Sequence, residues 1–258
     1  MSAGRPAVAR LTVTAMTHRG ALRDANEDAF VIGPLTAAGV DTLDPLVVDL
    51  VVQEPVVVAV ADGLGGHNAG EVASALAVRR LAERGPRTTD ASQVLQLLLD
   101  INAELYELAR THPAHTGAGT TAVGLLVTHH EVTWFNVGDS RLYREDGGYL
   151  GQVSVDDSPS TVWDDCGEPA TATNIVLQTL GGADRFEPVH PHSGTDVCPP
   201  GTRWLLCSDG LSDLVHASEM ESLLADNAGD DVRAVKALWA AAMNAGGGDN
   251  ITVVLVRG

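Results

Sequence analysis

Cysteine is scarce in this chain of 258 residues. Its three cysteines, Cys166, Cys198 and Cys207, are an odd number, lie far apart and match no zinc-site spacing. This pattern excludes a disulfide framework and a cysteine-based metal site. Reduced cysteines of this kind fit a reducing compartment, so the sequence predicts a cytoplasmic location.

Basic side chains are also few. The chain has 16 Lys and Arg residues against 34 Asp and Glu residues, a net charge of -18, and no basic patch is visible. Such a charge repels nucleic acid and anionic membranes, so neither is expected as a partner. Where acidic side chains converge, a bound divalent cation is the simplest explanation, because unpaired buried carboxylates are destabilising.

Long apolar runs are missing as well. Arg10 and His18 interrupt the N-terminal segment before a signal-peptide core or membrane span can form. The other apolar run, 46–60, is broken by Asp49, Gln53, Glu54 and Pro55. The chain is therefore predicted not to insert into a membrane, although its 45% hydrophobic residues suffice for a substantial core.

Strand-length runs rich in β-branched residues recur between turns, at 11–16, 28–32, 46–52, 56–61, 120–127, 131–137, 141–145, 203–207 and 250–256. Two consecutive helices are predicted after the fourth run. The first begins near Asn68, which can form a capping box with Glu71. The second begins near Asp90, paired with Gln93 in the same way, and ends near Arg110.

A third helix is predicted over about 230–244, before the last strand. This order differs from strict alternation of strand and helix. It favours an α+β fold of largely antiparallel sheets covered by helices. Residues 33–45 and 151–173 are predicted to be long loops, and 1–258 is expected to form a single domain.

Four aspartates stand in turns beside glycine, serine or asparagine: Asp62 in ADGLGGH, Asp139 in NVGDSRLY, Asp209 in LLCSDGLSD and Asp249 in GGGDNITVV. Any one of these turns is ordinary by itself. In the first three an apolar strand runs into the aspartate, and in the fourth the strand follows it. Strand ends gathered on one side of a sheet would bring the carboxylates into one cleft, and Mg²⁺ and Mn²⁺ prefer such ligands.

The segment RDANEDAF carries both signs of charge within six residues, with Arg23 followed by Glu27 and Asp28. A solvated loop and a functional segment both fit this pattern. A guanidinium offers a planar fork of donors suited to a phosphate, and the nearby carboxylates could hold water on a metal ion.

Six motifs in this order resemble those of the PPM family of metal-dependent protein phosphatases (type 2C), in its bacterial branch. They are RxxNED at 23–28, DGxGGH at 62–67, GTT at 119–121, VGDSR at 137–141, SDGLSD at 208–213 and GGxDN at 246–250. The resemblance covers nearly the whole chain. It implies a four-layer α-β-β-α sandwich with two central, largely antiparallel sheets and a two-metal site in a cleft at one end.

Matching positions imply the ligands of these metal ions. Asp62 corresponds to the carboxylate that bridges both ions, and the Gly63 carbonyl contributes to one of them. Asp209 and Asp249 correspond to ligands of the second ion, which Glu27 reaches directly or through water.

Further roles follow from the same resemblance. Asp139 corresponds to the residue that, with Asp209, holds a third metal ion in bacterial members. Asp28 is similar to an acid that orients the ligands, and Asn250 to a residue that supports the Asp249 turn. Arg23 resembles the arginine that binds the substrate phosphate. The residues implied to act in catalysis are Arg23, Asp62 and Asp209.

The implied chemistry is hydrolysis without a covalent phosphoenzyme. Two Mn²⁺ or Mg²⁺ ions roughly 3.5 to 4 Å apart can activate a water for in-line attack on phosphorus and neutralise charge on the phosphoryl oxygens. The family implies phosphoserine and phosphothreonine in other proteins as substrates, phosphorylated by a serine/threonine kinase. The enzyme is expected to be a monomer.

Some positions depart from the family pattern. Leu64 stands where eukaryotic members carry a histidine that is a candidate general acid, so the proton donor is unassigned. His67 belongs to the bacterial motif and is interpreted as structural. The segment 159–174 is shorter than the flap of bacterial members, and Asn174 stands at its end without an assigned role.

Two alternatives stay open beside a general phosphatase. A pseudophosphatase would keep the fold as a binding module, but it would not need Asp62, Asp209 and Asp249. A phosphatase dedicated to one anti-sigma-antagonist-type regulator usually lacks an arginine like Arg23. A serine nucleophile elbow and a nucleotide-binding loop are not supported, because neither Gly-x-Ser-x-Gly nor a Gly-Lys-Ser/Thr ending is present.

Overall fold

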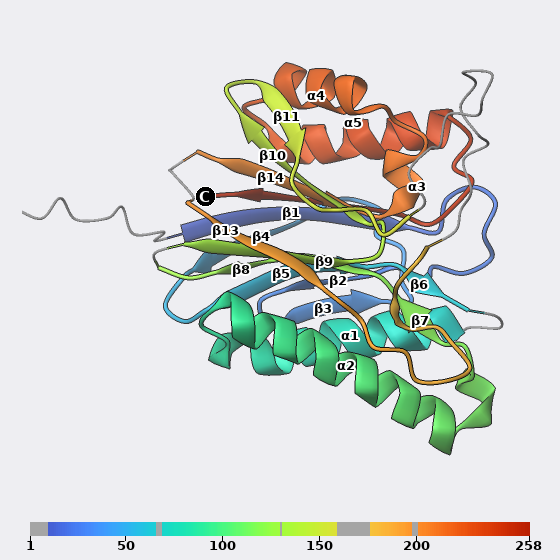
Figure 1. Ribbon diagram of the computed structural model, residues 1–258. Helices are drawn as coiled ribbons and strands as arrows, with labels where there is room; N and C mark the ends of the chain where they lie inside the picture. Colours follow the sequence, from blue (N-terminus) through green and yellow to red (C-terminus); the bar gives the residue numbers. More distant parts are fainter. Residues whose placement is uncertain (1–9, 66–68, 130, 159–175, 198–200) are drawn as a thin grey trace, which may run out of the picture.

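Two large β-sheets lie face to face in the computed structural model, which describes residues 10–65, 69–129, 131–158, 176–197 and 201–258 (Figure 1). One sheet has six strands in the order β11 (Tyr149–Gln152), β10 (Arg141–Asp146), β14 (Arg203–Cys207), β15 (Ile251–Arg257), β1 (Arg10–His18) and β4 (Leu46–Val51). The other has six in the order β13 (His192–Asp196), β9 (Val132–Val137), β8 (Ala122–Val127), β5 (Val56–Ala61), β2 (Ala29–Ile32) and β3 (Leu35–Ala38). Neighbouring strands in both sheets are antiparallel.

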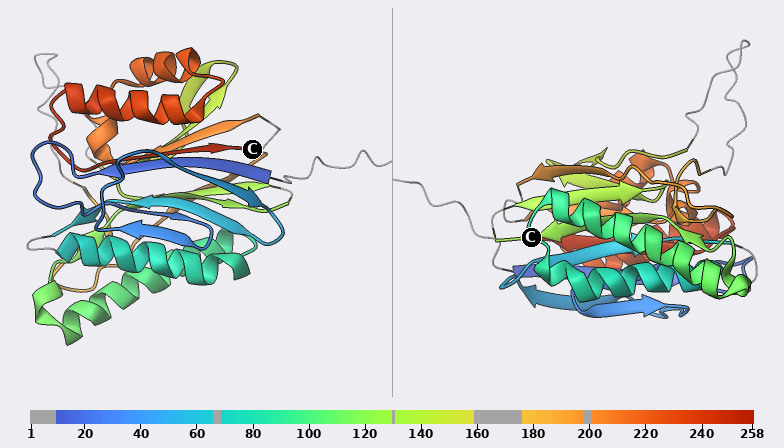
Figure 2. Two further views of the ribbon diagram at one scale, coloured as in Figure 1. Left: turned by 180° about the vertical axis from the view of Figure 1, so that it is seen from behind. Right: turned by 60° about the horizontal axis from the view of Figure 1, so that its bottom comes forward.

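Helices cover both outer faces of this sandwich. The β5 sheet is covered by α1 (Ala69–Arg84) and α2 (Ala91–Thr111), and the β15 sheet by α3 (Asp209–Ser212), α4 (Ala217–Asp226) and α5 (Asp231–Asn244). Figure 2 shows the same four layers from behind. Two short 3₁₀ helices, Gly85–Arg87 and Pro113–His115, follow α1 and α2. The predicted four-layer α-β-β-α sandwich is confirmed.

A third, small sheet joins β12 (Leu180–Gly181), β7 (Gly119–Thr120) and β6 (Gly63–Leu64). Its strand β6 immediately follows Asp62, so this sheet adjoins the acidic turns. Within the part of the chain that the structure describes, no helix combines the length and apolar character needed to cross a membrane.

The core consists of three apolar layers. Between the two large sheets, inward-facing side chains of both pack together, including Val13, Phe30, Leu125, Trp204 and Val254. A second layer lies under α1 and α2, and a third under α4 and α5. On α2 the side chains of Val94, Leu97, Leu98, Ile101 and Leu105 are buried, and that of Leu108 is partly buried. Burying one such leucine fully stabilises the fold by about 1.5 to 3 kcal/mol.

The structure corrects several of the local predictions. The expected loop 33–45 contains strand β3, which pairs with β2 through a tight turn that places Ile32 opposite Leu35. The turn residues Gly33 and Pro34 hid this hairpin, because proline usually argues against a strand. The expected loop 151–173 begins inside β11, and the rest of it from 159 onward lies outside the described residues. The short elements β11, β13 and α4 were not predicted individually.

The helix starts are correct where they can be seen. Asp90 caps α2, since its Oδ1 accepts from Gln93 N at 3.0 Å. The reciprocal bond differs from the predicted capping box: Gln93 Oε1 accepts from Thr89 N at 2.9 Å, one residue before the cap. Asp230 caps α5 in the same manner. Asn68, the predicted cap of α1, lies outside the described residues.

Candidate metal centre

The ends of several strands meet on one side of the sandwich and form an acidic cleft. Strand β5 runs into Asp62, β9 reaches Asp139 after Gly138, β14 leads through Ser208 to Asp209, and Asp249 stands two residues before β15. The cleft has a volume of about 230 Å³, and its lining includes every residue expected to bind metal or phosphate: Arg23, Glu27, Asp62, Gly63, Asp139, Asp209 and Asp249. The structure therefore brings the predicted set together.

Asp62 is held through its backbone by the GTT motif. Its N–H donates to Thr121 Oγ1 at 3.0 Å, and its carbonyl accepts from Thr121 N and Thr120 Oγ1, both at 2.9 Å. The next residue, Gly63, lies so close to the neighbouring loop that a Cβ there would stand 2.5 Å from Glu27 O. Only glycine allows this approach, so the two segments that carry Glu27 and Asp62 can share one cleft.

Asp28 lies buried beneath the cleft. Its Oδ2 accepts from the hydroxyls of Ser208 and Thr252, each at 2.7 Å, so it ties the strand before Asp209 to the strand after Asp249. Burial raises the pKa of Asp28 to about 6, although the two hydroxyl donors act against the shift. The carboxylate thus supports the turns that present the other acids, as expected of an orienting group.

Asn250 connects the loop of Arg23 and Glu27 to strand β15. Its Oδ1 accepts from Glu27 N at 2.8 Å, while its Nδ2 donates to Arg19 O at 3.1 Å and Ala25 O at 2.9 Å. Its own N–H donates to Asp249 Oδ1 at 2.8 Å. These four bonds agree with the supporting role expected for Asn250.

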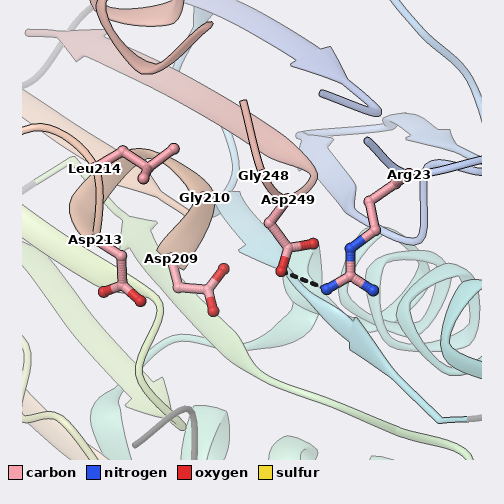
Figure 3. A pocket seen from close by; sticks show the side chains of 7 residues that line it. All are labelled: Arg23, Asp209, Gly210, Asp213, Leu214, Gly248 and Asp249. Atoms are coloured by element: carbon pink, nitrogen blue, oxygen red, sulfur yellow. Dashed lines mark hydrogen bonds and ion pairs between the residues drawn. The ribbon is translucent and has the colours of Figure 1, made fainter. Parts of the chain in front are cut away.

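Arg23 lies at the mouth of the cleft and pairs with a predicted metal ligand. Its Nη2 donates to Asp249 Oδ2 at 2.6 Å, and 55% of its side chain remains exposed (Figure 3). An adjoining hollow of about 360 Å³ extends from this pair across Asp209 to Asp213 and Leu214. The guanidinium is therefore placed where it can reach an anion entering from solvent.

Asp213 is a residue that sequence reasoning quoted but did not assign. It follows Asp209 by four residues, so the short helix α3 places both on the same face, where Figure 3 shows them side by side. The signal was present in the spacing of the two acids in SDGLSD. Thr121 was likewise unassigned, and its contact with Asp62 is visible only in the fold.

Burial and mutual repulsion disfavour the charged forms of these acids. The pKa of Asp209 rises to about 7, mainly by burial and then by the charges of Asp249 and Asp139. The pKa of Asp62 is raised well above its ordinary value by burial and by the charges of Asp28 and Asp209. Burial also raises the pKa of Glu27 and of Asp139. Among the described residues that line the cleft, Arg23 is the one cationic side chain.

These residues fit divalent cations in donor chemistry. All the side-chain donors are carboxylate oxygens, which Mg²⁺ and Mn²⁺ prefer. The Oδ1 atoms of Asp28 and Asp209 are buried without a hydrogen-bond partner among the described residues. As the side chains stand, no three His, Cys, Asp or Glu residues in the described part of the chain are arranged to hold an ion. Binding therefore requires the carboxylates to turn inward from the cleft walls.

Comparison with known proteins agrees with the motifs. Residues 43–241 match the family described as Protein phosphatase 2C. The serine/threonine phosphatase stp of Listeria welshimeri is 34% identical over 221 residues, covering 79% of this chain and 84% of that protein. Protein phosphatase PhpP of Streptococcus pneumoniae is 31% identical over 218 residues, covering 77% of this chain and 84% of that protein.

Solved structures show the same fold. The Mycobacterium tuberculosis serine/threonine phosphatase PstP/Ppp superimposes with a TM-score of 0.77 at 27% identity, covering 96% of this chain and 98% of that chain. The catalytic domain of PstP in complex with two manganese ions gives a TM-score of 0.76 at 28% identity, with the same coverage.

The chain belongs to the protein phosphatase 2C family. It is a protein serine/threonine phosphatase of this family, as the six motifs predicted. The residue roles implied by the resemblance stay predictions, although the structure places all of their carriers in or directly beneath one cleft.

Proposed function

We propose that this enzyme hydrolyses phosphoserine and phosphothreonine in proteins at a binuclear Mn²⁺ or Mg²⁺ centre in the acidic cleft. The observation that carries the proposal is the convergence of Asp62, Asp209 and Asp249 with Arg23 at the cleft mouth. A pair of bound divalent cations supplies an activated water and neutralises charge that builds on the phosphoryl oxygens.

The protein's own residues would divide this work by position. Asp62 would bind both ions, and Asp209 and Asp249 would bind the second, which Glu27 would reach directly or through water. Arg23 would leave Asp249 and bind the phosphate with its planar fork of N–H groups. Leu64 offers no proton, so the group that protonates the leaving alkoxide stays unassigned.

Domain organisation, oligomeric state, location and partners are part of the same proposal. We infer one domain, supported by the apolar layer that both large sheets share. We also infer a monomer in the cytoplasm that acts on the products of a serine/threonine kinase, from the family resemblance and the cysteine pattern. Asp139 is inferred to contribute, with Asp209, to the binding of a third ion.

A chelator-controlled assay on a phosphothreonine peptide tests the metal chemistry. Activity should appear with Mn²⁺ or Mg²⁺, disappear with excess EDTA and return when Mn²⁺ is restored. A circular dichroism spectrum in EDTA controls for unfolding. Hydrolysis that persists at full rate in EDTA would overturn the metal mechanism, and a folded, metal-loaded protein without hydrolysis would indicate the pseudophosphatase.

A further inference from the structure

Asp157 makes an unusual number of contacts just outside the cleft. Its side chain is only 12% exposed and accepts three hydrogen bonds. Oδ2 accepts from Gly138 N and from Gln178 Nε2, both at 2.8 Å, and Oδ1 accepts from His192 Nε2 at 2.8 Å. Three N–H groups from three separate segments thus converge on one carboxylate. We refer to Asp157, Gly138, Gln178 and His192 as the Asp157 junction.

The backbone of Asp157 strengthens this junction. Its N–H donates to Gly138 O at 3.0 Å, and its carbonyl accepts from Leu177 N at 2.6 Å. Asp157 therefore engages both the N–H and the carbonyl of Gly138. The residue after Gly138 is Asp139, whose carboxylate lines the cleft. Both peptide groups that flank Gly138 are thus held by Asp157, and the second of them leads to the predicted metal ligand Asp139.

Gly138 also contacts the residue that holds Asp62. Its φ of +98° is one that glycine adopts without strain, and a Cβ there would lie 2.6 Å from Thr121 Cγ2. Thr121 Oγ1 accepts from Asp62 N at 3.0 Å and lies 2.7 Å from Ser140 Oγ. The turn 138–140 is thus fixed on one side by Asp157 and on the other by the threonine that anchors Asp62.

We propose that Asp157 is a positioning residue: it fixes the Gly138–Asp139 turn so that the Asp139 carboxylate stands at the correct place relative to Asp62 for cation binding. The inference rests on the proposed metal function of the cleft. Because Asp157 does not line the cleft, its effect on cation binding would pass through Asp139. Removing its contacts should loosen the Asp139 ligand and weaken cation binding there by about 10- to 100-fold, the range typical of groups that orient metal ligands.

The chemistry of the junction separates two substitutions. In Asp157→Ala all three N–H groups lose their acceptor. In Asp157→Asn the amide oxygen can still accept from Gly138 N, while the amide N–H can donate to His192 in the tautomer whose Nε2 is an acceptor. The asparagine variant should therefore bind cations more nearly like the wild type than the alanine variant does.

The test is direct Mn²⁺ binding to the purified full chain, measured from the electron paramagnetic resonance signal of the free ion. We expect Asp139→Asn and Asp157→Ala each to weaken the same binding step by about 10- to 100-fold. The double variant should bind Mn²⁺ no more weakly than Asp139→Asn alone, since Asp157 then has no ligand left to position. Asp196→Asn is the matched control: Asp196 lies on the same edge strand β13 as His192, and the substitution removes its ion pair to Arg144 of β10. This variant should bind Mn²⁺ as the wild type does.

Several results would overturn the inference. The first is wild-type Mn²⁺ affinity in Asp157→Ala. The second is an equal loss of Mn²⁺ affinity from Asp157→Ala whether or not Asp139→Asn is also present. The third is no loss of Mn²⁺ affinity in Asp139→Asn itself. Thermal unfolding checks that each variant is folded. If Asp157→Ala does not fold, Asp157→Ser replaces it, because its short side chain also cannot span to Gly138 N.

The inference and the proposed function fail in different ways. Suppose that the Asp139 and Asp157 substitutions show the expected coupling in Mn²⁺ binding, but the wild-type protein hydrolyses no phosphopeptide. This result contradicts the proposed function and leaves the positioning role intact. Mn²⁺-dependent hydrolysis with no coupling between Asp139 and Asp157 contradicts the positioning role alone. A wild-type protein that binds no Mn²⁺ contradicts both.

Discussion

Arg23 pairs with Asp249 in the structure, and in the proposed function it would bind the substrate phosphate instead. The pKa of its guanidinium is raised mainly by the hydrogen bond to Asp249. A cation bound by Asp249 would replace this positive charge and free the guanidinium. The exposed half of the side chain then has only a short path to a phosphate in the adjoining hollow.

Replacing Arg23 tests this role. In Arg23→Ala we expect KM for a phosphothreonine peptide to rise about tenfold or more, because a charge-assisted hydrogen bond is worth about 1.5 to 3 kcal/mol. Steady-state kinetics in saturating Mn²⁺ measure it. Arg19→Ala is the matched control, since Arg19 pairs with Asp41 and its side chain does not line the cleft. An unchanged KM in Arg23→Ala would contradict phosphate binding by this residue.

At the scale of elements, the helices stabilise the fold while the strand ends carry the chemistry. Asp90 and Asp230 accept from the third residue of α2 and α5 through their side chains. These caps lie in opposite outer layers, and neither residue lines the acidic cleft. Their loss should therefore affect stability and not catalysis.

Asp90→Ala measures this separation. The free energy of unfolding should fall by about 1 kcal/mol, the usual cost of losing an aspartate cap. For a chain of this size that corresponds to a fall in Tm of about 2 to 4 °C. Asp230→Ala should behave alike. A change in kcat/KM at a temperature where either variant is fully folded would show that the outer helices also shape the cleft.

At the scale of the whole molecule, the buried acids couple stability to pH and to cations. The pKa of Asp209 rises in the fold from an ordinary 3.8 to about 7. The folded state therefore retains this proton at pH values where the unfolded chain has released it. Stability should fall as pH rises from about 4 to about 7 and then level off, because above that range both states are ionised.

Asp209→Asn isolates this contribution in EDTA. The variant should lose less stability than the wild type between about pH 4 and pH 7, by about 1 to 2 kcal/mol once partial exposure is allowed for. It should also lack phosphatase activity. Urea unfolding at several pH values measures the first effect. Identical pH slopes for the two proteins would show that the Asp209 carboxylate is not destabilising in the metal-free fold.

Part of the fold and part of the candidate site could be predicted from the sequence alone. The strands, two helix starts and six motifs are local patterns of side-chain period, turn residue and spacing, so they could be predicted without coordinates. The resemblance carried by those motifs predicted the four layers and the set of cleft residues. The short elements β11, β13 and α4 escaped, because their signals are weaker than those of longer segments.

Only the tertiary structure decided which groups meet. Arg23 and Asp249 are 226 residues apart in sequence yet form an ion pair, and nothing in either motif indicates it. Asp213 lies in the adjoining hollow through one turn of helix, and Asp157 contacts Gly138, Gln178 and His192 from three separate segments. Such contacts depend on the packing of sheets and loops that are distant in sequence. The pKa shifts caused by burial and by neighbouring charges arise only once that packing exists.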